Sequence, residues 1–131
     1  MYTIVAGVDQ NQERTTALAR AIKGLPIDID RLSVVLIHSF NENRSGASVA
    51  QVSAIQRAQE VLEESGIDVI LEESGNDDPS EAVRQIADEY DADLIAVAGR
   101  KRSPTRKALF GSVSQELMLD SELPVLVCSP E

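Results

Sequence analysis

The fold class is decided by the stretch Leu32-Ser33-Val34-Val35-Leu36-Ile37, which is apolar almost throughout and rich in β-branched side chains. A continuous run of this length, without polar alternation, is typical of a strand that is buried on both faces of a parallel sheet. Parallel strands are joined by crossover connections, most often helices, which cover the faces of the sheet. We therefore expect strands and helices to alternate along the rest of the chain.

The sequence on either side of this stretch has that alternation. Four further apolar runs of strand length are present, at residues 3–8, 67–71, 93–98 and 124–128. The stretches between strands have apolar residues at helical spacing and predict helices. The predicted helices cover residues from about 12 to 24, from 49 to Gly66, from 79 to 90, and from 112 to about 119.

Capping signals support three helix boundaries. Asp78 is a predicted N-cap, Pro79 follows at the first helical position, and Glu81 stands three residues after the cap. A second capping box spans residues 112–115, and Gly66 is a predicted C-terminal stop. In the helix before Gly66, the periodicity predicts a mostly apolar stripe through Val49, Val52, Ile55, Gln56, Gln59 and Leu62.

Five strands alternating with four helices predict a single α/β domain over residues 1–131, with a doubly wound parallel sheet. The length of 131 residues suits one domain, and no Pro/Gly/Ser-rich linker or internal repeat interrupts it. Ligands of such sheets bind at the carboxyl ends of the strands, where the strand order reverses. We therefore expect a ligand where the first and fourth strands end, near the loops at residues 9–12, 38–46 and 99–111.

The composition narrows the classes of partner. Apolar residues make up 43% of the chain, and no apolar run approaches the length of a membrane span. The net charge of −10 would repel a nucleic acid. The N-terminal residues do not read as a signal peptide, and Cys128 is the single cysteine, so we expect a cytoplasmic location without disulfides. An acidic protein with 3 lysines among 12 basic residues also suggests a halophilic, high-salt cytoplasm.

The segment from Gly99 to Ser112 has an unusual charge. It contains five basic residues and no acidic one, whereas the rest of the chain carries 7 basic and 22 acidic residues. Such a loop attracts anions, and it leads into a helix N-terminus, whose free N–H groups favour a phosphate. The alternative is that its basic residues pair with acidic residues of the same chain. The charge pattern alone leaves both interpretations open.

Several segments together resemble the universal stress protein family. They are the first strand ending in Val8-Asp9, the second ending in Ile37-His38, the helix and strand over residues 82–98, the segment Gly111-Ser112-Val113, and the closing Leu123-Pro124-Val125-Leu126-Val127. These segments cover essentially the whole chain in the order of the family. The resemblance implies the adenine nucleotide α-hydrolase-like fold of that family.

Nucleotide-binding members of the family carry Gly, two residues, Gly, nine residues, and then Gly-Ser or Gly-Thr. Their glycines let backbone amides wrap the phosphates. Here Gly99 matches the first glycine and Gly111 the last, but Arg102 replaces the second glycine and only eight residues separate it from Gly111. Pro104 removes a further backbone donor. We therefore expect an altered amide cradle.

Two consequences of this departure stay open. The side chains of Arg100, Arg102 and Arg106 can replace the amide contacts with charge-assisted hydrogen bonds. The same changes can instead mark a member that no longer binds ATP.

The resemblance implies a site for ATP or a related nucleotide. Its base and ribose would lie by Gly7, Asp9 and Ser39. Ala98 and Gly99 would form the floor of the pocket. The residues that would contact phosphates are Gly111, Ser112, Val113 and Ser114. Asp9 suits a ribose because a carboxylate accepts from both hydroxyls, although a turn or helix cap would explain it equally.

No catalytic or metal-binding constellation is evident. The sequence has no Gly-x-Ser-x-Gly elbow, Walker loop or Gly-x-Gly-x-x-Gly motif, and the single His38 has no ligand-spaced partner. Three interpretations remain: a nucleotide-binding stress or regulatory protein, a non-binding dimeric interaction module, and a small phosphotransfer or adenylyl-transfer enzyme. The resemblance also implies a homodimer through the last strand, Leu123 to Cys128, which would otherwise be an exposed apolar edge.

Overall fold

A computed structural model describes residues 1–8, 12–39, 46–74, 78–98 and 112–128, with the backbone alone at 38–39, 46–52, 74 and 112. In these residues, five parallel strands form one sheet with the order β3-β2-β1-β4-β5. The strands are β1 (Tyr2–Val8), β2 (Leu32–Ser39), β3 (Asp68–Ser74), β4 (Leu94–Ala98) and β5 (Val125–Cys128). The helices are α1 (Gln12–Lys23), α2 (Gly46–Glu64), α3 (Pro79–Glu89) and α4 (Ser112–Asp120), with a short 3₁₀ helix η1 (Ile29–Arg31) before β2. The five-stranded, doubly wound α/β fold predicted from the sequence is confirmed.

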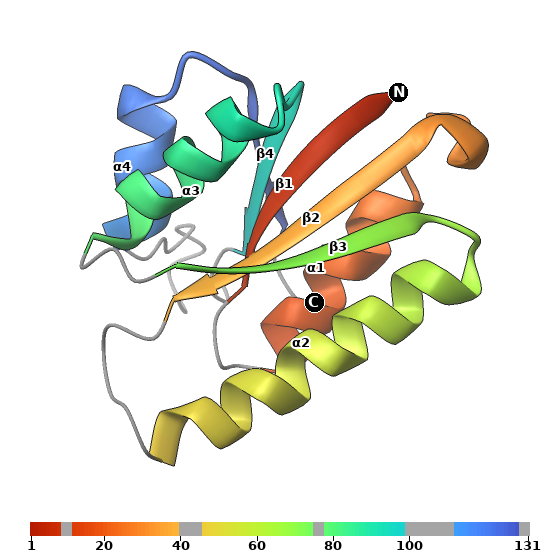
Figure 1. Cartoon of the computed structure of the whole chain (residues 1–131), viewed down its shortest axis with the longest axis horizontal. Coiled ribbons are helices and arrows are strands. Elements are labelled where there is room, and N and C mark those ends of the chain that lie inside the picture. Colours follow the sequence, from red (N-terminus) through yellow and green to blue (C-terminus); the bar gives the residue numbers. More distant parts are fainter. Residues whose placement is uncertain (9–11, 40–45, 75–77, 99–111, 129–131) are drawn as a thin grey trace, which may run out of the picture.

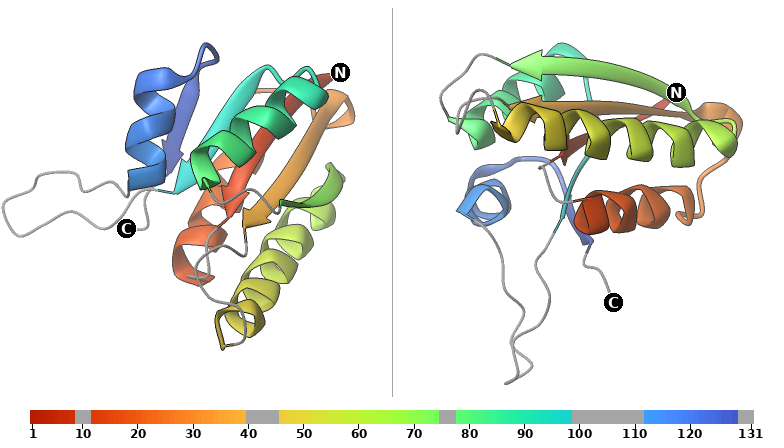
Figure 2. Two further views of the ribbon diagram at one scale, coloured as in Figure 1. Left: turned by 60° about the vertical axis from the view of Figure 1, so that its left-hand side comes forward. Right: turned by 90° about the horizontal axis from the view of Figure 1, so that it is seen from below.

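The sheet is covered on both faces, so its central strands are apolar on both sides. Along β1, the buried side chains of Ile4 and Ala6 belong to the core cluster beneath α1 and α2. Val5, which lies between them in sequence, belongs to the cluster beneath α3 and α4. Figures 1 and 2 show the two helical layers, with α4 and β5 at one side of the sheet and α2 towards the other.

The strand order reverses at β1. On one side β1 pairs with β2, with Gly7 opposite Ile37, and on the other side it pairs with β4, with Gly7 opposite Val97. The chain therefore builds outward from β1 to β3, and then crosses back to add β4 and β5. The carboxyl ends of β1 and β4 lie side by side, which is where doubly wound sheets bind ligands.

Tertiary pairing extends two strands beyond the limits that the sequence suggested. β2 continues to Ser39, and β3 continues to Ser74 instead of ending at Leu71. The added residues are polar, but they pair in register, with Glu72 opposite Ile37 and Ser74 opposite Ser39. Hydrogen bonding to a neighbouring strand, which hydropathy does not report, therefore sets these ends.

The buried side of α2 is more apolar than the predicted stripe. Gln56 is exposed and Gln59 is only partly buried. The predicted Ile55 and Leu62 are buried, and further buried side chains are Ala54, Ala58 and Val61. Gly66 has φ +87°, as expected for a glycine that ends a helix.

The N-terminus of α3 has the predicted cap. The Asp78 carboxylate accepts hydrogen bonds from the backbone N–H groups of Ser80 (3.1 Å) and Glu81 (3.4 Å), and Pro79 opens the helix. The hydrogen bond from the Ser80 side chain, followed by that from the Glu81 backbone, lowers the pKa of Asp78 below its ordinary value. The ionised carboxylate is therefore the stronger acceptor for this cap.

We expect Asp78→Ala to lower the melting temperature at pH 7 by roughly 3–6 °C, because loss of a helix cap is a local destabilisation. The pKa of Asp78 is lower in the folded state than in the unfolded chain. Its contribution is thus fully present above about pH 4, the ordinary pKa, and is lost as the pH falls through the folded-state value. Thermal unfolding followed by circular dichroism should show wild type and variant converging in acid. Equal melting temperatures at pH 7 would rule out this role, and Asp78→Asn, which keeps an acceptor, is the matched control.

Candidate nucleotide site at the carboxyl ends of β1 and β4

The described part of the candidate site joins the end of β4 to the first turn of α4. The Ser114 hydroxyl donates a hydrogen bond of 3.3 Å to the carbonyl oxygen of Ala98, the last residue of β4. The Ser114 side chain is buried, with 5% exposure. Two residues that the sequence assigned to the site are therefore in contact, although they are 16 positions apart.

This bond limits what Ser114 can offer to a phosphate. A serine hydroxyl has one hydrogen, and here it is donated to Ala98. Ser114 is therefore best described as a residue that fixes α4 to β4. The backbone N–H groups of the first helical turn have no partner within the helix, and they remain the groups suited to an anion.

Val113 and Leu117 orient the same turn. Leu117 is fully buried in the cluster beneath α3 and α4, and Val113 packs against that cluster. The family resemblance implied a phosphate contact for Val113, and the structure gives its side chain a packing role. A phosphate contact through its backbone remains compatible with that packing.

Gly7 lies one residue before the end of β1 and faces α3. A methyl group added at Gly7 would lie 3.4 Å from a methyl of Val83 and 3.8 Å from one of Val97. Both are ordinary van der Waals distances, so the packing of α3 on β1 does not by itself require a glycine. If Gly7 is required, the reason must be the close approach of a group other than these two valine side chains, such as a ligand.

The other predicted site residues are less fully described. For Ser39 and Ser112 the structure gives the backbone, at the end of β2 and the start of α4. Outside the described residues lie Asp9, Gly99, Arg100, Arg102, Arg106 and Gly111. Their proposed contacts remain predictions.

Cys128 lies next to the site in the sheet. It is opposite Ala98 in the pairing of β5 with β4, and its side chain is 5% exposed. Burial raises the pKa of the Cys128 thiol to about 11. The thiol is therefore protonated at neutral pH, as expected for a structural cysteine and unsuited to a nucleophile.

A polar cluster between α3 and α4 was not predicted from the sequence. The buried Ser80 hydroxyl contacts two carboxylate oxygens, Oδ1 of Asp78 at 2.9 Å and Oε2 of Glu116 at 2.5 Å. Ser80 and Glu116 are 36 positions apart, so no local pattern links them. Only the packing of α3 beside α4 brings them together.

Within the described ranges, no three His, Cys, Asp or Glu side chains gather as a metal site would require. Of the helices in that part of the chain, none combines the length and apolar character needed to cross a membrane.

Comparison with known proteins identifies the family. The model of the universal stress protein family matches residues 1–129 of this chain. The chain belongs to the universal stress protein family. A universal stress protein of Mycolicibacterium smegmatis is 31% identical over 84 residues, which are 64% of this chain and 65% of that protein. The stress response protein NhaX of Bacillus subtilis is 31% identical over 77 residues, which are 54% of this chain and 46% of that protein.

Solved universal stress proteins share the fold at low sequence identity. One from Archaeoglobus fulgidus superposes with a TM-score of 0.82 at 24% identity, covering 98% of both chains. A second structure of universal stress protein from that organism, solved in complex with dAMP, gives 0.76 at 19% identity and the same coverage. A family member from Arabidopsis thaliana with AMP bound gives 0.70 at 11% identity, covering 100% of this chain and 93% of that one.

We expect native Cys128 to react slowly with a thiol reagent such as DTNB at pH 8. Raising the thiol pKa from 9.0 to about 11 lowers the thiolate fraction roughly a hundredfold, and burial adds to the effect. Because Cys128 is the single cysteine, labelling reports on this site directly. The same protein unfolded in guanidinium serves as the control. Rapid, stoichiometric labelling of the native protein would contradict the buried position.

Proposed function

We propose that this chain binds an adenine nucleotide at the carboxyl ends of β1 and β4, in a stress-response or regulatory role. The observation that carries the proposal is the bond from Ser114 Oγ to the Ala98 carbonyl, at 3.3 Å. This bond places the N-terminus of α4 beside the end of β4, at the switch point of the sheet. Relatives of the same fold have been solved with dAMP, cAMP and AMP.

The phosphate end of the nucleotide would face the first turn of α4. The partial positive charge of a helix N-terminus favours a phosphate. The segment from Gly99 to Ser112, which leads directly into α4 in the sequence, contains five basic residues. Arg100, Arg102 and Arg106 would supply the charge-assisted contacts that the missing second glycine does not provide. ATP is the proposed ligand because it makes the fullest use of these groups.

The sugar end would lie by β1. Asp9 follows β1 directly, and its carboxylate would accept hydrogen bonds from ribose hydroxyls. The A. fulgidus complex contains dAMP, which lacks the 2′-hydroxyl, so the ribose contact of Asp9 has to be tested on this chain itself.

The cytoplasmic location and the halophilic habitat suggested by composition also remain predictions.

The first test is whether purified protein retains a nucleotide and whether Asp9 contributes to its binding. Mass spectrometry of the supernatant after denaturation should detect an adenine nucleotide. In calorimetric titrations with ATP, Asp9→Ala should weaken binding roughly tenfold or more, because a lost hydrogen-bond partner leaves ribose hydroxyls unpaired. The wild type should also bind dATP more weakly than ATP, and the variant should barely distinguish the two.

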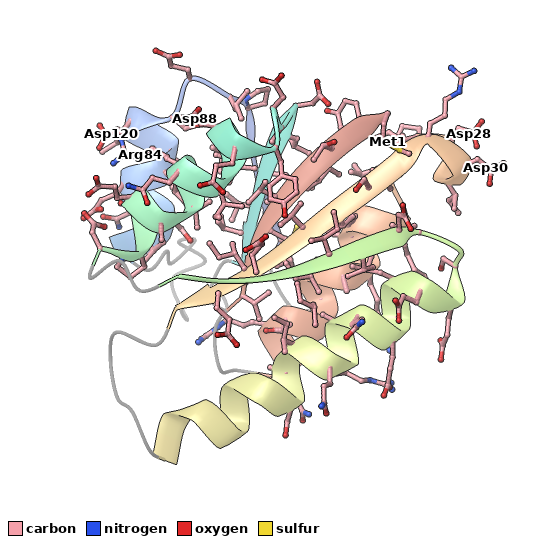
Figure 3. The ribbon with its side chains drawn as sticks, viewed as in Figure 1. Met1, Asp28, Asp30, Arg84, Asp88 and Asp120 are labelled. Atoms are coloured by element: carbon pink, nitrogen blue, oxygen red, sulfur yellow. The ribbon has the colours of Figure 1, made fainter. Side chains whose placement is uncertain are left out.

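The matched control is Asp30→Ala, which removes a carboxylate from η1 at the opposite end of the sheet, as Figure 3 shows. It should leave nucleotide affinity unchanged, and neither substitution should alter the melting temperature strongly. If Asp9→Ala lowers the stability of the unliganded protein but leaves ATP binding intact, Asp9 is a cap or turn residue and the ribose assignment is wrong.

We also propose a homodimer through β5. In the described part of the chain, β5 pairs with β4 alone, and Val125, Leu126 and Val127 are only partly buried. Pairing with a second copy about a two-fold axis would cover this edge. Each chain carries a net charge of −10, so salt should favour association by screening the repulsion. Sedimentation velocity at micromolar concentration should show a dimer that strengthens as salt rises, whereas a monomer under all conditions would exclude it.

A further inference from the structure

α4 has a limited apolar anchor in the core. The helix has nine residues, and a helix this short needs tertiary contacts to be stable. Leu117 is fully buried, but the neighbouring Met118 and Leu119 are 38% and 84% exposed. The position of α4 therefore depends strongly on the polar contacts that hold it to the rest of the domain.

The Ser80–Glu116 hydrogen bond is such a contact. Ser80, near the start of α3, is 1% exposed, and its Oγ lies 2.5 Å from Oε2 of Glu116 in α4. The hydroxyl also lies 2.9 Å from Oδ1 of Asp78, but its single hydrogen serves one carboxylate at a time. Asp78 accepts from the backbone N–H groups of Ser80 and Glu81 in any case. When the hydroxyl hydrogen goes to Glu116, Asp78 loses the largest of the contributions that lower its pKa, but the two backbone N–H donors still maintain the α3 cap.

α4 is thus fixed in two directions close to its first turn. Ser114 ties it to the end of β4, and Glu116, two residues later, ties it to α3. Figures 1 and 2 show α3 and α4 side by side on the same face of the sheet. The two hydrogen bonds reach different neighbours of α4, the end of β4 and α3, so together they oppose movement of the helix away from either one.

We propose that Ser80 and Glu116 are positioning residues of the nucleotide site, which hold the first turn of α4 in the place where it meets a phosphate. This inference rests on the proposed function, because it concerns the affinity of the same site. Hydrogen bonds from backbone N–H groups weaken steeply when their direction changes. A small displacement of α4 would therefore weaken phosphate binding, although neither Ser80 nor Glu116 touches the ligand.

The test combines nucleotide affinity with a direct measure of how firmly α4 is held. Ser80→Ala and Glu116→Ala should each weaken ATP binding roughly three- to tenfold, the effect of one hydrogen bond. Both should speed amide hydrogen exchange in α4 of the unliganded protein. Both substitutions remove the Ser80–Glu116 bond, and Ser80→Ala also removes the contact with Asp78, so the double variant should bind ATP no more weakly than Ser80→Ala alone.

Two further variants separate positioning from charge and from general damage. Glu116→Gln keeps an acceptor for the Ser80 hydroxyl, so it should retain wild-type exchange in α4 and bind ATP at least as well. Asp120→Ala removes a carboxylate from the exposed last residue of the same helix, far from its first turn, and is the matched control that should change neither reading. If Glu116 acted only by its negative charge, Glu116→Ala would tighten ATP binding and Ser80→Ala would have no effect.

The outcomes for the two proposals are distinct. If the wild type binds no adenine nucleotide, the proposed function is wrong. If the wild type binds ATP and Ser80→Ala leaves either the α4 exchange rates or the ATP affinity at wild-type values, the positioning role is wrong. Additive losses in the double variant would likewise overturn it.

Discussion

The structure depends on the pairing of β1 with a strand on each side. β2 and β4 both bond to β1, and its side chains Ile4, Val5 and Ala6 are completely buried between the two helical layers. A parallel strand in this position leaves no face for water, so helices must cover both sides. The crossover back to β4 then brings the ends of β1 and β4 next to each other. The place for a ligand is thus a consequence of how the sheet is wound.

The layer of α3 and α4 places polar groups near the carboxyl ends of β1 and β4. α1 and α2 bury the larger cluster on the opposite face, whereas α3 and α4 meet near the strand ends through polar bonds. The family resemblance implied a phosphate contact for Ser114, but its hydroxyl donates a hydrogen bond to the Ala98 carbonyl and holds α4 in place. Side-chain hydrogen bonds at this edge therefore orient α4, and the backbone N–H groups of its first turn are the proposed contacts for an anion.

Among the described residues, one edge of β5 has no neighbouring strand. Within the described residues β5 is an edge strand, and it carries Cys128 at the end that adjoins Ala98. Pairing of this edge with a second copy of the chain is the proposed mode of assembly. The acidic character of the chain opposes such association unless salt screens it.

Sequence alone determined the features that depend on local chemistry. The apolar run from Leu32 to Ile37 predicted a strand buried on both faces, and the Asp78 cap with Pro79 predicted the start of α3. The alternation of strands and helices was enough for the fold class, because a parallel strand pair requires a crossover. The departure of the Gly99 loop from the family pattern was also visible at this level, since it concerns the backbone freedom of single residues.

Tertiary structure decided what depends on distant partners. The polar ends of β2 and β3 became strand because each pairs with the other, and the buried side of α2 includes alanines that the helical spacing did not single out. No pattern linked Ser80 to Glu116 or showed that Ser114 would donate to Ala98. Hydrophobic periodicity reports which face of an element is buried, but not which element covers it. The partners of a buried hydroxyl are therefore known only once the helices are packed, because they come from segments tens of residues apart.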